Sequence, residues 1–68
     1  MRRDSFLFTL YKNERAENRT YDTVTTDSEA YEMAEKLEKH LKLDKVDIFR
    51  QYVEWQHIGV REDGELTI

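Results

Sequence analysis

The sequence predicts a small α+β domain in which two helices pack together and a β-hairpin follows them. Two stretches, residues 28–41 and 44–57, carry apolar residues at helical spacing, and the second one stops shortly before Gly59. The final stretch, residues 58–68, alternates in polarity around an Asp-Gly pair, a pattern typical of a β-hairpin. We therefore expect two packed helices, at about 28–41 and 44–57, and a C-terminal hairpin at about 58–68.

The length and composition of the chain narrow the possible functions. With 68 residues, a single domain spanning 1–68 is expected. A domain of this size buries only about 60% of the surface that its unfolded chain exposes, which leaves little room for an enclosed catalytic pocket. The chain contains no cysteine, which excludes disulfides and cysteine zinc sites and fits a cytoplasmic location. No apolar run approaches the ~20 residues of a membrane span, so no membrane contact is expected.

The N-terminal third allows two interpretations. Residues 5–11 and 20–26 are rich in β-formers and flank a polar stretch, which favours an N-terminal β-hairpin. The apolar residues of the first segment also fall on one face of a helix, so a first helix is the alternative.

The first expected helix, residues 28–41, has a clear start. Thr26 and Glu29 form a T-x-x-E capping box, in which the threonine hydroxyl accepts from the amide three residues on and the glutamate reaches back. Four apolar residues then recur at helical spacing: Ala30, Ala34, Leu37 and Leu41. This stripe is the face that we expect to pack against the rest of the domain.

The second expected helix, residues 44–57, is predicted from its spacing although many of its residues are β-formers. Wound as a helix, the segment has an apolar half and a polar half. Asp44 can cap its start, and Gly59 can end it in a left-handed turn. In this arrangement Tyr52 and Trp55 belong to the core.

The register of the closing hairpin follows from its charges. A two-residue loop at Asp63-Gly64 would place Glu62 opposite Glu65, which is a repulsive pair. A three-residue loop with Gly64 in the left-handed position avoids this repulsion and places Arg61 opposite Glu65. We therefore expect the three-residue loop.

The order of helix, turn, helix, glycine and hairpin resembles the winged helix-turn-helix superfamily over about residues 36–68. The segment KLEKHLKL, residues 36–43, places its leucines where that family has apolar residues, and Asp44 resembles the polar cap of the family's second helix. The final segment IGVREDGELTI resembles the wing. Glu38 and Lys42 depart from the alanine and glycine that are usual at their places. The resemblance implies that the second helix enters the major groove of DNA.

If this resemblance holds, five side chains are candidate DNA contacts. Arginine and glutamine can read guanine and adenine edges, and lysine and arginine can bind phosphates. The expected contacts are Lys42, Lys45, Arg50, Gln51 and Arg61. The leading hypothesis is therefore a small non-enzymatic DNA-binding or transcription-regulatory protein with double-stranded DNA as its partner. A homodimer would supply the two half-sites of a specific DNA target.

The charge of the chain favours an alternative function. The net charge is −4, whereas phosphate binding draws its affinity from lysine and arginine. The alternative is an acidic protein-protein interaction module, a regulator or inhibitor of the kind that viruses and mobile elements encode. An exposed aromatic patch would favour this alternative.

The sequence shows no constellation of residues for catalysis or metal binding. His40 and His57 lie 17 positions apart, and neither has a partner at a zinc-motif spacing. Both glycines, Gly59 and Gly64, are expected in turns, so no phosphate-binding loop remains. We expect no catalytic residue, no metal and no cofactor.

Overall fold

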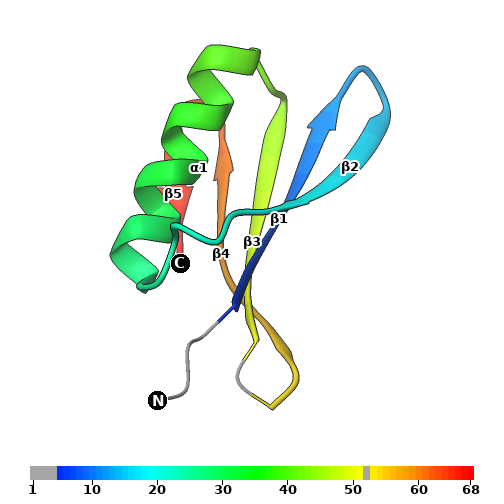
Figure 1. Cartoon of the computed structure of the whole chain (residues 1–68). Helices are drawn as coiled ribbons and strands as arrows, with labels where there is room; N and C mark the ends of the chain where they lie inside the picture. The colour runs from blue at the N-terminus through cyan, green and yellow to red at the C-terminus, as the bar shows by residue number, and fades with distance from the viewer. Residues whose placement is uncertain (1–4, 52) are drawn as a thin grey trace.

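The protein is a five-stranded antiparallel sheet with one helix packed on one of its faces (Figure 1). The computed structural model describes residues 5–51 and 53–68. The elements are β1 Ser5–Lys12, β2 Arg15–Thr20, α1 Asp27–Leu41, β3 Lys45–Gln51, β4 Trp55–Glu62 and β5 Glu65–Thr67. The strand order is β2-β1-β3-β4-β5, so β1 and β3 pair although they are far apart in the sequence. We call the face of the sheet that packs on α1 the covered face and the opposite one the open face.

The N-terminal hairpin is confirmed, and the alternative first helix is wrong. Its turn consists of two residues, Asn13 and Glu14, with φ of 51° and 65°. Positive φ at both central residues is typical of the type I′ turn, whose twist suits two paired strands. The predicted position of the second strand, residues 20–26, is wrong, because β2 begins at Arg15 and residues 21–26 lead into α1.

The first helix is confirmed, with Thr26 as its N-cap. The amide of Glu29 donates to the Thr26 hydroxyl oxygen at 3.1 Å. The Glu29 carboxylate accepts from the Thr25 amide at 3.2 Å and from the Thr25 hydroxyl at 2.7 Å. The helix ends at Leu41, and Lys42 then adopts the left-handed conformation with φ of 53°. Residues close together in the sequence therefore determine where α1 begins and which of its faces is apolar.

The second helix is wrong, because residues 44–57 contain β3 and the beginning of β4. In β3, Val46 and Ile48 point to the covered face, while Asp47 and Phe49 point to the open face. A central strand with apolar side chains on both faces loses its simple alternation and imitates the pattern of a helix. The β-forming residue types of this segment indicate the strand correctly, whereas the helical spacing does not.

The expected wing is part of the continuous sheet, so the predicted arrangement of two helices followed by a separate wing is wrong. Its two strands do form a hairpin, but Glu62 pairs with Glu65 across a two-residue turn. The turn residues Asp63 and Gly64 have φ of 55° and 77°. The predicted three-residue loop is therefore also wrong. Both glutamates are exposed, where water and salt weaken their repulsion.

A buried ion pair explains this register. Arg61 Nε donates to the Glu38 carboxylate of α1 at 2.9 Å, and the Gly64 amide donates to the other oxygen of that carboxylate at 3.2 Å. Arg61 also donates to the Gly64 carbonyl at 3.0 Å. Arg61 must face α1 to make these bonds, and its neighbour across the hairpin, Leu66, then faces the core as well.

One extra residue interrupts the pairing of β3 with β4. Ile48 pairs with Gly59, but the next residue, Phe49, pairs with His57, which leaves Ile58 in a β-bulge. The Ile58 side chain packs against the core.

Gly59 was expected to end a helix, and this expectation is wrong. It lies within β4, close under α1. A Cβ atom at this position would lie 3.0 Å from Tyr31 Cε1 and 3.3 Å from the Thr67 carbonyl oxygen. The Tyr31 hydroxyl donates to the Ile58 carbonyl at 2.9 Å. The glycine therefore permits the close approach of helix and sheet.

The hydrophobic core lies between α1 and the covered face. Its buried members are Phe6, Phe8, Leu10, Val24, Ala30, Ala34, Leu37, Val46 and Ile48. In the part of the chain that the structure describes, no helix has the length and apolar character needed to cross a membrane.

Candidate binding surfaces

The five side chains predicted to bind DNA do not share one surface. Lys42 caps the C-terminal end of α1, and Lys45 points to the open face. Arg50 points to the covered side, where it pairs with the first residue of α1 at 2.7 Å. Gln51 ends β3, and Arg61 is buried. The helix that would have grouped them does not exist among residues 5–51 and 53–68.

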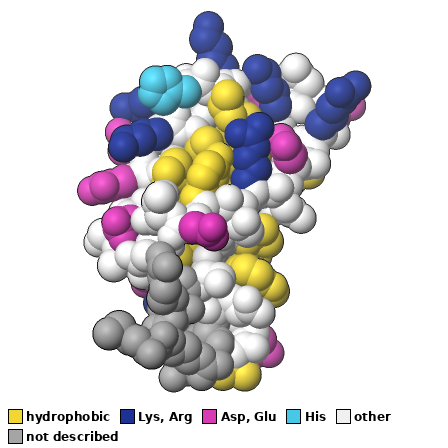
Figure 2. All heavy atoms as spheres, viewed as in Figure 1, with side chains coloured by type: hydrophobic (Ala, Val, Ile, Leu, Met, Phe, Trp, Pro, Cys, Tyr) yellow, Lys and Arg dark blue, Asp and Glu magenta, His cyan; other side chains and the backbone are white. Residues whose placement is uncertain are grey.

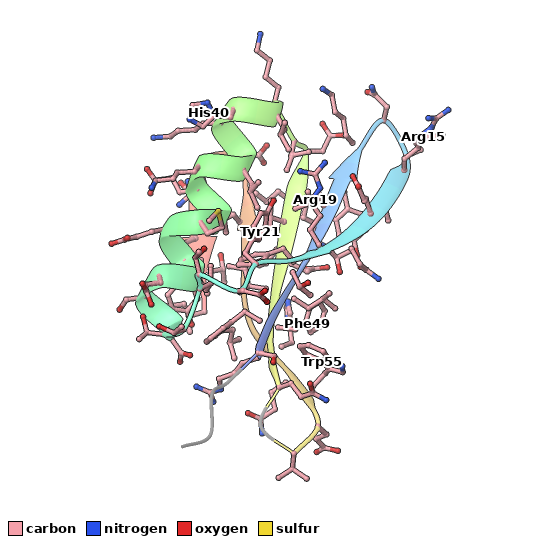
Figure 3. The ribbon with its side chains drawn as sticks, viewed as in Figure 1. Arg15, Arg19, Tyr21, His40, Phe49 and Trp55 are labelled. Carbon is pink, nitrogen blue, oxygen red and sulfur yellow. The ribbon has the colours of Figure 1, made fainter. Side chains whose placement is uncertain are left out.

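The open face has no covering layer in the described chain, and part of it is not polar. The antiparallel register brings Leu7 of β1, Phe49 of β3 and His57 of β4 into one row. Trp55, two residues before His57 in β4, lies on the same face at the lower end of the sheet, where Figure 3 labels it beside Phe49. We call these four side chains the aromatic patch. A solvated face of an antiparallel sheet normally carries polar side chains, so this patch needs an explanation.

The aromatic patch is accessible. The Phe49 and His57 rings lie 5.0 Å apart at an interplanar angle of 45°. Trp55 is 44% exposed, so its predicted place in the core is wrong. Tyr52, predicted to accompany it there, lies outside the described residues. Large aromatic side chains are among the groups that most often anchor protein interfaces.

A polar cluster centred on Asp47 adjoins the aromatic patch. The Asp47 side chain is only 13% exposed, and its carboxylate lies 3.2 Å from His57 Nε2 and 3.9 Å from Lys45 Nζ. A hydrogen bond to the same carboxylate raises the pKa of the Tyr11 phenol, with burial and the negative charge of Asp47 adding to it. The Lys45 ammonium also lies 5.2 Å from the Tyr11 ring centroid. The cluster holds the side chains in place, but a flat sheet surface lacks the enclosure of a catalytic site.

The rim of the open face is acidic. Glu62 and Glu65 lie side by side across β4 and β5 at one end of this face, and Glu54 is exposed next to Trp55 at the other. Among the strand residues described, Lys45 is the one cation that points to this face, and it already contacts Asp47. The open face therefore combines the aromatic patch with negative charge.

A second surface lies on the opposite side of the sheet, between α1 and the β1–β2 hairpin. The helix covers β3 and β4, and the hairpin projects beyond it (Figure 1). A groove with a volume of about 560 Å³ lies between them. Figure 2 shows hydrophobic side chains there with Lys and Arg side chains on both sides. The apolar residues that line the groove are Leu10, Ala16, Leu41 and Leu43.

Three cations line this groove: Lys12, Arg15 and Arg19. Lys12 Nζ donates to the Leu41 carbonyl at the end of α1 at 2.9 Å. A hydrogen bond with Tyr21 raises the pKa of Arg19, and a 3.3 Å ion pair with Glu17 adds to this rise. Arg15 is exposed and makes no ion pair within the described residues; Figure 3 labels it at the tip of the hairpin. We call this region the basic groove.

The surfaces define a two-layer α/β domain with an uncovered aromatic sheet face and a basic groove beside its helix. No protein-family model matches the chain, and neither a curated protein nor a solved structure matches it. These comparisons therefore leave the resemblance to winged helix-turn-helix proteins untested, and the function must be argued from the surfaces. No group of three or more metal-ligating side chains occurs within the described ranges.

Proposed function

We propose that this protein is a non-enzymatic protein-interaction module whose open face binds a partner protein. One observation carries the proposal: the aromatic patch is uncovered, with Trp55 44% exposed and the His57 side chain 50% exposed. Exposing such side chains to water has a free-energy cost that a partner can remove by covering them.

The charge of the open face indicates the chemistry of the partner. Asp47 adjoins the aromatic patch and is engaged with Lys45. Glu54 precedes Trp55, and Glu62 and Glu65 lie at the other end of the open face. A partner with an apolar centre and a basic rim would match both features, since complementary charge raises the association rate and excludes wrong partners. The cysteine-free composition suits a reducing compartment, and we propose the cytoplasm as the place of this interaction.

The DNA-binding hypothesis stays a prediction, and the geometry supports it less well. Of its five proposed contacts, only Lys45 and Gln51 lie on the open face, and Arg61 is buried against Glu38. The acidic rim would repel phosphates. A homodimer formed through the open face is likewise a prediction that the following experiment tests.

The experiment uses Trp55, the single tryptophan of the chain, as a reporter. Immobilised protein captures candidate partners from a cytoplasmic extract, and each purified candidate is titrated while tryptophan emission is recorded. A partner that covers the open face shifts the Trp55 emission to shorter wavelength. Phe49→Thr keeps a β-forming residue but removes the ring, and we expect it to weaken binding on the order of 30-fold, as loss of an interface anchor does.

The matched control is Ile68→Thr, because Ile68 is 84% exposed and lies beyond β5. It should leave both affinity and emission shift unchanged. Equal binding by Phe49→Thr and the original protein would reject the open face as the site. Self-association detected by sedimentation and lost in Phe49→Thr would identify a second copy as the occupant. A Trp55 emission change with duplex DNA at low salt, without any protein partner, would favour the DNA-binding hypothesis.

A further inference from the structure

The basic groove combines an apolar floor with a cationic rim, and it lies on the other side of the sheet from the aromatic patch. We infer that the basic groove is a second docking site, which binds an acidic amphipathic helix of a protein. This inference does not depend on the proposed function of the open face.

The shape of the domain provides the first argument. In a two-layer domain a helix covers the apolar part of a sheet, but α1 lies over β3 and β4 and leaves the outer strand β2 without a helix. Leu41 and Leu43 remain half-buried at the edge of this gap, beside the buried Leu10. A second helix packed alongside α1 would cover these leucines, and an amphipathic helix supplies the apolar stripe that this requires.

The charge of the groove provides the second argument. Lys12, Arg15 and Arg19 line the groove against one carboxylate, that of Glu17, although the whole chain has a net charge of −4. Arg15 and Arg19 are four residues apart on β2, a separation of roughly 13 Å along the strand. Two turns of helix cover about 11 Å, so acidic side chains two turns apart can reach both arginines. The matching occupant therefore carries leucine-like residues on one side and carboxylates along its edge.

The apolar floor argues for a protein segment over the other anionic ligands. Phosphates of a nucleic acid or of lipid headgroups would use the three cations but leave the leucines without a contact. The Glu17 carboxylate at the rim would also repel a densely charged polyanion. An amphipathic helix would contact both the leucines of the floor and the cations of the rim.

The test uses a fluorescein-labelled peptide of about 18 residues, long enough to form a helix when bound. It carries leucines along one face and glutamates two turns apart, and a matched peptide replaces every glutamate with lysine. We expect fluorescence anisotropy to rise with the acidic peptide and not with the lysine peptide, and to fall as salt is added. Arg15→Glu combined with Arg19→Glu should weaken binding on the order of tenfold, since two exposed ion pairs become repulsive.

Matched variants make the result specific. Lys39→Glu makes the same charge reversal as each single substitution, on the side of α1 that does not line the groove, where Lys39 pairs with Glu35, and should leave peptide affinity unchanged. Phe49→Thr should also leave it unchanged, so failure of the open-face proposal and failure of this one are distinguishable. In ¹⁵N-labelled protein, the amide shifts caused by the peptide should centre on Arg15, Leu41 and Leu43.

Several results would overturn the inference. The inference is wrong if the acidic peptide does not bind, or if the lysine peptide binds as tightly as the acidic one. It is also wrong if the Arg15→Glu, Arg19→Glu variant binds the acidic peptide as tightly as the original protein does. Binding of duplex DNA or of vesicles containing anionic phospholipid, lost in that variant while the acidic peptide fails to bind, would assign the groove to a phosphate-bearing ligand instead.

Discussion

The two faces of the central strand β3 differ in what covers them. On the covered face, Val46 and Ile48 are fully buried under α1. On the open face, the alternate residues Asp47 and Phe49 support a surface that no element of the described chain covers. Neighbouring residues of one strand therefore serve different purposes: one set provides the free energy of folding, and the other is available for a partner.

The charged groups show the same division. On the covered face Glu38 and Arg61 form a buried pair with further bonds to Gly64. On the open face the Asp47–His57 contact includes an imidazole that is half exposed. Loss of a partner should therefore matter for stability on the covered face and much less on the open face.

The largest effect should separate two phenylalanines of the two faces. Phe8→Ala removes a fully buried ring from the core and should lower the free energy of unfolding by roughly 3–5 kcal/mol. Phe49→Ala removes a ring from the open face and should cost less than about 1.5 kcal/mol, because little packing is lost. Urea unfolding followed by circular dichroism measures both. Equal losses would mean that the open face is packed as tightly as the core.

The next largest effect on stability concerns the buried ion pair of Glu38 and Arg61. Glu38→Ala leaves the Arg61 guanidinium buried without its main partner and should cost about 3 kcal/mol. His57→Ala on the open face should cost less than about 1 kcal/mol. Replacing both Glu38 and Arg61 by methionine should cost less than Glu38→Ala alone, because no unpaired charge remains. Thermal unfolding ranks the three variants, and a double variant less stable than Glu38→Ala would contradict this account.

A smaller effect distinguishes the two glycines. Gly59→Ala places a methyl group against the Tyr31 ring and the Thr67 carbonyl and should cost roughly 1–3 kcal/mol. Gly64→Ala meets no atom within 4 Å, so its cost, about 1 kcal/mol, comes from the positive φ of 77°. Adding Tyr31→Ala should recover part of the loss in Gly59→Ala and none of the loss in Gly64→Ala. Double-mutant analysis of unfolding free energies checks this difference.

The smallest effect lies at the start of α1, which covers one face only. Thr26→Ala removes the N-cap and should cost about 1 kcal/mol. Hydrogen bonds from Thr25 and Thr26 lower the pKa of Glu29. The stability from these bonds is therefore present above the ordinary pKa of a glutamate and is lost as pH falls through the lowered value. The difference in unfolding free energy between the original protein and Glu29→Ala should narrow over that acid range; a difference independent of pH would exclude this linkage.

The parts of the fold that depend on neighbours in sequence could be predicted. The capping box of Thr26 and Glu29 is complete within four residues, so α1 was found with its correct N-cap. The β1–β2 hairpin was found as well, although its turn was missed, because Asn13-Glu14 is not one of the usual glycine-containing pairs.

The parts that depend on distant residues could not be predicted. Whether Val46 to Gln51 form a helix or a strand depends on β1, whose pairing positions lie about 40 residues earlier. The register of the last hairpin depends on Glu38 of α1, because Arg61 must reach it. A helical interpretation of residues 44–57 also hides the aromatic patch, because the patch exists only when the segment is a strand. The β-forming residue types of this segment are the signal that could have revealed it.

The bulge at Ile58 determines which side chains of β4 lie on the open face. Because β4 carries one surplus residue there, His57 lies beside Phe49 on the open face, and Trp55 follows two positions away on the same side. If β4 paired with β3 without this bulge, Ile58 would lie opposite Phe49, and the His57 and Trp55 rings would turn toward the helix layer. A slip of one position in the pairing would thus erase this surface without any change in the sequence.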